Sequence, residues 1–239
     1  MTLSYDGSNY HGFQKQKNSH TIEAEINDAL LKIHKKAVKI TASGRTDKGV
    51  HALGQVFHFD SNLNMTPNQF KRALNSHLPK DIVILEITEV SDDFNARHSA
   101  IKKTYKYIIN QEYNLFHRHH EFYFPHPLDL TLLKAALDKL IGRHDFYAFA
   151  GYVKDKPTVK EMYEAFYKVE GSRIILTFTG NAFLKYMVRK IVGTLIDIAT
   201  HKKDIKVIDE MFQTKNRNLC GKTINPEGLY LVKVDYERN

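Results

Sequence analysis

Residues 66–87, TPNQFKRALNSHLPKDIVILEI, contain a complete helix start followed closely by an apolar strand. The first four residues have the spacing of a capping box with proline at the first helical position, so we expect a helix running to about Leu78. The continuous apolar run Ile82–Ile87 is typical of a strand. This stretch therefore predicts a chain built from alternating helices and strands.

The sequence before this stretch completes the pattern. Leu3 and Tyr5 alternate with polar residues before the turn Asp6-Gly7, which indicates a strand. Apolar residues from Ile22 to Ile33 recur on one helical face, and Gln55–Phe59 is typical of another strand. The order is roughly strand, helix, strand, strand, helix, strand, a split βαβ pattern.

The rest of the chain repeats this pattern loosely. The expected strands are 104–109, 162–169, 173–179 and 229–236, and the expected helices are 130–140, 182–200 and 204–213. Strands with hairpin-like neighbours favour an antiparallel or mixed sheet. We expect an α+β fold with two split-βαβ (ferredoxin-like) halves, residues 1–96 and 97–239, around a central sheet with the active-site cleft between them.

The composition narrows the class of protein. The formal net charge is +8 in 239 residues, and a basic surface favours an acidic partner such as nucleic acid. Cys220 is the only cysteine, so a disulfide within the chain and a cysteine-based zinc site are excluded, and a reducing cytoplasm fits best. No apolar run is long enough to cross a bilayer, and the amino terminus lacks a signal-peptide pattern.

The segment Gly44-Arg45-Thr46-Asp47-Lys48-Gly49-Val50-His51 places a carboxylate beside cations on a glycine-bracketed turn. Glycines permit positive φ and close backbone approach, so a bulky substrate can reach Asp47. The spacing of the two glycines resembles a P-loop, but Val50-His51 replaces the required Lys-Ser/Thr, which excludes that motif. By residue type alone, a structural turn is the more common explanation.

Arg189 lies in an apolar helical segment, where a guanidinium needs a carboxylate or phosphate to offset its desolvation. Its partner is either Asp47, in a catalytic site, or another acid in a structural ion pair. Gly193, one turn later, is expected to open room beside the guanidinium. Tyr105 and Tyr107 share one face of their strand, where they either pack in the core or stack on a base.

The segment His117-Arg118-His119-His120 suggests a metal site, but three histidines within four residues rarely converge on one ion. We expect no metal there. A basic loop near RNA phosphates is the better interpretation.

The chain resembles the tRNA pseudouridine synthase A (TruA) family. The resemblance extends over nearly the whole sequence through blocks in family order: residues 5–14, 44–51, 93–97, 105–107, 181–193 and 227–231. Lys48 stands where the family usually has alanine, which leaves the choice of target site open.

This resemblance implies isomerisation of uridine to pseudouridine in the anticodon stem-loop of tRNA, at positions 38–40, without a cofactor. Asp47 matches the essential aspartate, acting as nucleophile or proton-transfer group, and Arg189 matches its arginine partner. Tyr105 matches the tyrosine that stacks on the target base, and Arg45 matches the arginine that fills the space left by that nucleotide. The family works as a homodimer bridged by tRNA.

Two other functions remain open from the residues alone. The first is a non-catalytic RNA-binding module that uses the same basic face. The second is a metal-dependent RNA phosphodiesterase that uses the histidine-rich segment, and the lack of a second acidic cluster makes it remote.

Overall fold

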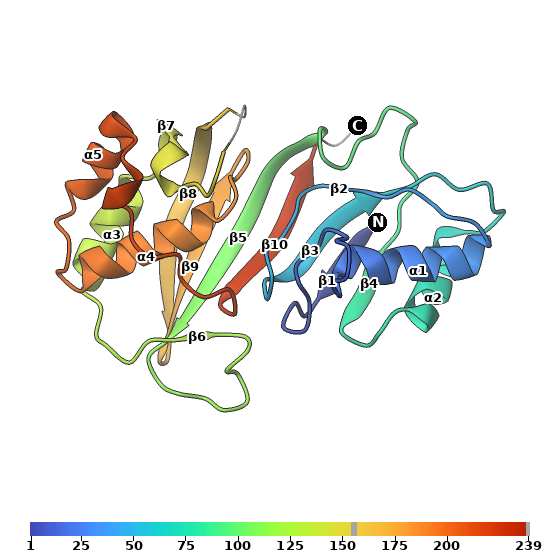
Figure 1. The fold of residues 1–239 in the computed structure, drawn as a ribbon, viewed down its shortest axis with the longest axis horizontal. Coiled ribbons are helices and arrows are strands. Elements are labelled where there is room, and N and C mark those ends of the chain that lie inside the picture. The colour runs from blue at the N-terminus through green and yellow to red at the C-terminus, as the bar shows by residue number, and fades with distance from the viewer. Residues whose placement is uncertain (154–156, 238–239) are drawn as a thin grey trace. The chain divides into compact units, whose positions relative to one another are not determined.

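The computed structural model describes residues 1–153 and 157–237. The chain forms two compact units, which Figure 1 shows coloured along the sequence. Unit 1 contains Met1–Ile101 and the segment from Tyr230 onward, and unit 2 contains Lys102–Leu229. The carboxy-terminal strand therefore returns to the amino-terminal unit.

Unit 1 has a sheet in the order β4-β1-β3-β10. Strands β4, β1 and β3 are antiparallel, and β10 is parallel to β3. The short β2 pairs antiparallel with the carboxy-terminal end of β3. Helix α2 packs on α1 and β4. The elements are β1 (Thr2–Tyr5), α1 (Ile22–His34), β2 (Thr41–Ala42), β3 (His51–His58), α2 (Pro67–His77), β4 (Ile82–Glu86) and β10 (Leu229–Tyr236).

The predicted capping box is confirmed at the start of α2. The Thr66 side chain accepts a hydrogen bond from the Gln69 backbone N–H, and the Gln69 side chain accepts one from the Thr66 N–H. The core of this unit contains Leu3, Ile26 and Leu74, all 0% exposed. The apolar periodicity of both helices is thus explained by packing against the same core.

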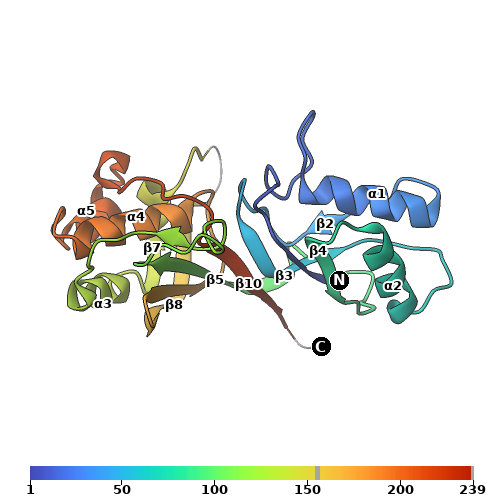
Figure 2. The same ribbon diagram turned by 90° about the horizontal axis from the view of Figure 1, so that it is seen from below.

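Unit 2 is built on the antiparallel strands β5-β9-β8-β7, with β6 parallel to β5. Helix α3 packs on α4 and on β8, and Figure 2 shows α3, α4 and α5 gathered together. The elements are β5 (Ala100–Asn110), β6 (Phe122–Tyr123), α3 (Leu130–Asp138), β7 (Gly142–Asp145), η1 (Phe146–Phe149), β8 (Val159–Glu170), β9 (Arg173–Gly180), α4 (Met187–Ala199), α5 (Val207–Thr214) and η2 (Arg217–Leu219).

The predicted α+β class with mixed pairing is confirmed, because each unit combines antiparallel and parallel strand pairs. The order in unit 1 is the predicted βαββαβ. The predicted domains, 1–96 and 97–239, begin and end at residues different from those of the compact units. As a division into independently folding parts, they stay a prediction. Across the described residues, no helix has both the length and the apolar character needed to span a bilayer.

Helix α4 begins later than the expected residue 182. Tyr186 has φ +63°, a left-handed conformation that a continuous helix excludes, so the helix begins at Met187. The preceding residues 181–186 form an irregular segment.

Within α4, Gly193 is required by a close backbone contact. A Cβ on Gly193 would lie 2.0 Å from the Lys222 carbonyl oxygen, and one on Gly221 would lie 2.4 Å from the Gly193 carbonyl carbon. The two backbones therefore touch where neither residue has a side chain.

Replacing Gly193 with alanine should destabilise the protein by about 1–3 kcal/mol or more, because the Cβ overpacks against backbone. At an unobstructed helix position the same change would stabilise by about 1 kcal/mol. The matched control is Gln213→Ala, an exposed position in α5, which should change stability by less than about 0.5 kcal/mol. Urea unfolding monitored by circular dichroism measures both variants, and an unchanged or raised stability of Gly193→Ala would contradict the contact.

Candidate functional site

The Asp47 loop, residues 43–50, connects β2 to β3 and is fixed at its start by a buried amide. Gln55 is 0% exposed. Its Oε1 accepts hydrogen bonds from Ser43 Oγ at 2.7 Å and from the Val56 N–H at 3.1 Å, and its Nε2 donates to the Gly44 carbonyl at 3.2 Å. Because a buried amide with several partners has little freedom to move, the beginning of the loop has a defined position.

Thr46, the residue before Asp47, is held through its side chain and its backbone. Its Oγ1 lies 2.8 Å from the hydroxyl oxygen of Tyr5, and its carbonyl accepts from the Phe13 N–H at 3.1 Å. Burial raises the pKa of the Tyr5 hydroxyl well above its ordinary value, so this group stays protonated. Two partners far away in sequence thus determine the backbone position next to Asp47.

Glycines allow the segment 6–13 to lie directly against the Asp47 loop. Gly12 has φ +93°, and a Cβ there would lie 2.7 Å from the Thr46 carbonyl oxygen. A Cβ on Gly7 would lie 2.0 Å from the Val50 carbonyl oxygen. The Gly49 N–H donates to the Tyr10 carbonyl at 3.2 Å, so backbone contacts flank Asp47 on both sides.

Of the two glycines that bracket the loop, only Gly49 has a positive φ, at +75°. Gly44 therefore does not use the positive φ that glycine permits. The Val50 N–H donates to the Asp47 carbonyl at 3.2 Å, which closes the tight turn that Gly49 permits.

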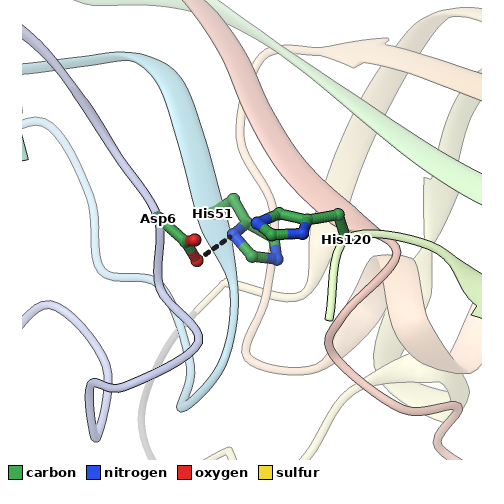
Figure 3. A group of neighbouring side chains, drawn as sticks. All are labelled: Asp6, His51 and His120. Carbon is green, nitrogen blue, oxygen red and sulfur yellow. Dashed lines mark ion pairs between the residues drawn. The ribbon is translucent and has the colours of Figure 1, made fainter. Parts of the chain in front are cut away.

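His51 ends the loop and begins β3. Its ring is 1% exposed and stacks on Tyr230, with centroids 4.6 Å apart. Nδ1 accepts from the Gly7 N–H at 3.1 Å and lies 3.2 Å from Asp6 Oδ1, and Figure 3 shows the carboxylate pointing at this nitrogen.

These two contacts make opposite demands on Nδ1, because it accepts from Gly7 only without a proton and donates to Asp6 only with one. We assign the acceptor form, since Asp6 Oδ1 already accepts from the Ser8 N–H at 3.0 Å and from Ser8 Oγ at 2.6 Å. His51 therefore ties the end of the Asp47 loop to the Gly7 turn.

The side chains of the loop differ in exposure. Asp47 is half-buried, whereas Arg45 and Lys48 are exposed. The Asp47 carboxylate therefore stands on a fixed backbone and partly out of water, and the exposed cations beside it are accessible to a polyanion.

Tyr105 lies on β5 in unit 2 and is 8% exposed. Its ring meets that of Phe183 edge-on, at 4.9 Å between centroids, and its cross-strand partner is Phe178. Aromatic neighbours thus fix the ring orientation. Tyr107, on the same strand, is 0% exposed and belongs to the core.

Arg189 lies in the first turn of α4, and its guanidinium is oriented by the chain that follows η2. Its Nε donates to the Ile224 carbonyl at 2.6 Å, and its Cζ lies 5.4 Å from the centroid of the Tyr186 ring. The bond through Nε fixes the plane of the guanidinium, and the edge formed by its two Nη groups has the geometry that suits a two-pronged contact with a carboxylate.

The expected role of Gly193 in giving room to this guanidinium is wrong. The space beside Gly193 is occupied by backbone of Lys222 and by the Ile224 side chain. Gly193 instead lets this segment approach α4, so that the Ile224 carbonyl can reach Arg189.

The predicted residues are divided between the units: Arg45 and Asp47 lie in unit 1, and Tyr105 and Arg189 lie in unit 2. The pairing of Asp47 with Arg189 stays a prediction, as do the roles of Arg45 and Tyr105. Sequence reasoning left the glycine-rich segment 5–14 open between surface packing and RNA contact, and did not connect its glycines with the Asp47 loop. It missed Thr46 and Ile224, which contribute through backbone atoms.

The histidine-rich segment contributes His117 to an ion network. His117 Nδ1 lies 2.8 Å from Arg173 Nη2 and 3.1 Å from Glu121 Oε1, and Arg173 Nε lies 2.7 Å from the same carboxylate oxygen. Because Arg173 is always charged, Nδ1 accepts its hydrogen bond. This ring therefore supports the local structure of its loop.

Comparison with known proteins gives a consistent result. A family model described as tRNA pseudouridine synthase matches residues 1–99 and 136–237. A protein of Geobacillus sp. (strain WCH70) named tRNA pseudouridine synthase A is 43% identical over 240 residues, covering 99% of this chain and 97% of the relative. A protein of the same name from Listeria monocytogenes serotype 4b is 43% identical over 241 residues, covering 98% of this chain and 97% of the relative.

Among solved structures, the crystal structure of a Cbf5-Nop10-Gar1 complex matches with a TM-score of 0.35 and 10% identity. The match covers 82% of this chain and 54% of the matched chain.

Gly12→Ala should destabilise the protein more than Gly171→Ala, although both glycines have positive φ, +93° and +60°. Both variants incur about 1–2 kcal/mol for a left-handed alanine. Gly12→Ala adds an overpacking cost of about 1–3 kcal/mol, because its Cβ meets the Thr46 carbonyl, whereas a Cβ on Gly171 has nothing within 4 Å. Urea unfolding compares the two, and equal losses would show that the segment 6–13 does not constrain the Asp47 loop.

Proposed function

This chain belongs to the tRNA pseudouridine synthase A family and is a tRNA pseudouridine synthase, and we propose that it isomerises uridines of the anticodon stem-loop, at positions 38–40 of the tRNA. The observation that carries this proposal is the Asp47 loop. A half-buried carboxylate stands on a backbone fixed at Gly44, Thr46 and Val50, in a chain that matches the family on both sides of it.

The reaction transfers the uracil ring within one nucleotide. The bond between ribose C1′ and uracil N1 breaks, the ring turns, and C1′ bonds to C5, while the proton leaves C5 and N1 gains one. No electrons are gained or lost overall, so the chemistry requires neither a redox cofactor nor an energy source. We propose that the enzyme works without a cofactor and without a metal.

Asp47 is the proposed catalytic residue. A carboxylate removed from bulk water is a better nucleophile toward C1′ and a better proton acceptor than one in solution, and both roles remain open. The Arg189 guanidinium, oriented by Ile224, is the proposed partner that keeps this carboxylate charged and correctly directed.

Arg45 and Tyr105 are the proposed substrate-binding residues. A base inside a stem must leave its stack, which costs a few kcal/mol. The exposed Arg45 side chain is a long planar cation that suits the vacated space. The Tyr105 ring, oriented by Phe183, suits stacking on the extruded uracil.

The assembly and the location are parts of the same proposal. We propose a homodimer in the cytoplasm, with the anticodon arm of tRNA as its partner and no association with membrane. The net charge of +8 and the single cysteine support a nucleic-acid partner in a reducing compartment.

Asp47→Asn should lower the rate of pseudouridine formation by about 10³-fold or more, which is the scale of general acid–base and covalent catalysis. Tritium release from tRNA labelled at uracil C5 measures the rate, and filter binding should show that tRNA affinity persists. The matched control is Asp60→Asn, an exposed residue of the same unit with the same loss of charge, which should retain the rate. Turnover retained by Asp47→Asn would remove this residue from the mechanism.

Arg189→Lys should reduce kcat by about 10- to 100-fold, because an ammonium cannot both donate to the Ile224 carbonyl and present a two-pronged edge to a carboxylate. The same tritium assay applies, with thermal unfolding as a check on folding. Arg143→Lys, at an exposed position of β7, is the control and should keep the wild-type rate. A normal kcat in Arg189→Lys would argue against the proposed ion pair.

A further inference from the structure

Unit 2 contains a cavity of about 210 Å³ beside the loop 111–121, which connects β5 to β6. The residues that line it come from the end of β5, from this loop, from β6 and from the segment before β10. They include Glu112, Tyr113, Arg118, Tyr123, Asn225 and Glu227. None of the residues proposed for the reaction, Asp47, Arg189, Arg45 and Tyr105, lines this cavity.

The loop beside the cavity is held by its own hydrogen bonds. The Asn114 side chain accepts from the Phe116 N–H at 3.0 Å, and Arg118 Nη1 donates to the Leu115 carbonyl at 2.7 Å. The base of the loop is anchored by Glu121, 8% exposed, whose Oε2 accepts from Asn110 Nδ2 at 2.7 Å. A loop fixed in this way loses little conformational entropy when it binds a ligand.

This ordered loop presents aromatic rings to solvent. Phe116 is 84% exposed and Tyr113 is 59% exposed. Tyr113 meets Tyr123 edge-on, with centroids 5.4 Å apart, so the rim of the cavity carries rings of fixed orientation. Exposed aromatic rings on a rigid support are the usual platform for stacking unpaired bases.

The charges of the cavity favour a base over a phosphate. Glu112 and Glu227 line it, and carboxylates repel a phosphate while accepting hydrogen bonds from base N–H groups. Arg118, the cation in the lining, uses Nη1 to hold the Leu115 carbonyl. A neutral planar ligand with N–H donors therefore fits this lining best.

The cavity also adjoins the groups expected to hold the target uridine. Asn225, in its wall, follows Ile224, whose carbonyl orients Arg189. The Tyr107 hydroxyl donates to the Asn225 carbonyl at 2.8 Å, and Tyr107 lies two residues after Tyr105 on β5. The wall of the cavity is therefore bonded to the strand that carries Tyr105.

We propose that this cavity and Phe116 form a second RNA contact, which takes an unpaired nucleobase of the tRNA near the target uridine. The inference rests on the proposed function, because it assumes that tRNA is the substrate. The loop 111–121, with Phe116, falls between the two stretches matched by the family model, residues 1–99 and 136–237, whereas Asn225 and Glu227 lie within the second stretch.

The test compares three variants of the full chain for binding of unmodified tRNA by fluorescence anisotropy. Phe116→Ser should weaken binding by about 5- to 100-fold, the range for loss of one stacked base. Phe116→Tyr keeps a stacking ring and should bind like the wild type. The control Phe166→Ser removes a 48% exposed ring on β8 of the same unit and should have no effect.

Salt dependence separates a base contact from a phosphate contact. Loss of a phosphate contact reduces the slope of log Kd against log[salt] by about 1, whereas loss of base stacking leaves the slope unchanged. Phe116→Ser should therefore keep the wild-type slope between about 50 and about 200 mM salt. A changed slope would overturn the assignment to a base.

Other results would also end the proposal. Unchanged tRNA binding by Phe116→Ser, in a protein whose wild type forms pseudouridine, would refute this inference and leave the proposed function intact. A change of mass in sedimentation velocity, with unchanged RNA binding, would show that Phe116 contacts a second copy of the chain instead. Failure of the wild type to bind tRNA or form pseudouridine would refute the proposed function itself.

Discussion

The direct backbone contact between residues 6–13 and the Asp47 loop is the constraint on which the site in unit 1 depends. Hydrogen bonds link the two segments at Thr46 and Gly49, and His51 adds a third link through the Gly7 N–H. Gly7 and Gly12 make this approach possible because any Cβ would collide with the opposite chain. The loop is thus rigid because another segment is fitted to it, although the loop itself contains two glycines.

In unit 2, backbone from a distant segment likewise positions a functional residue, Arg189, but through a single hydrogen bond. The guanidinium is oriented by one main-chain carbonyl, that of Ile224, and this carbonyl reaches α4 because Gly193 has no side chain. In both units, a charged side chain has its direction set by backbone that lies far from it in sequence. Backbone donors and acceptors suit this task, since they do not change rotamer.

Much of the fold was predictable because local chemistry determined it. The capping box at Thr66 acts within one turn, and the alternating residues of β10 gave its bounds, Leu229–Tyr236, from the sequence. The motif around Asp47 was recognisable because residues 44–51 match a family signature at every position except Lys48. The late start of α4 was not predictable, since only the left-handed φ of Tyr186 reveals it. Thr46 and Ile224 act through backbone atoms that every residue shares, so no pattern of side chains marks them.

The touching backbones of Gly193 and Gly221 restrict how this enzyme can evolve. Overpacking in a core can be relieved by a second mutation that shrinks the neighbouring side chain, but here an added Cβ would meet backbone atoms, the Lys222 carbonyl oxygen at Gly193 and the Gly193 carbonyl carbon at Gly221. A mutation at one position therefore has no compensating partner at the other. A side chain at either position can therefore be accommodated only if the backbone itself moves.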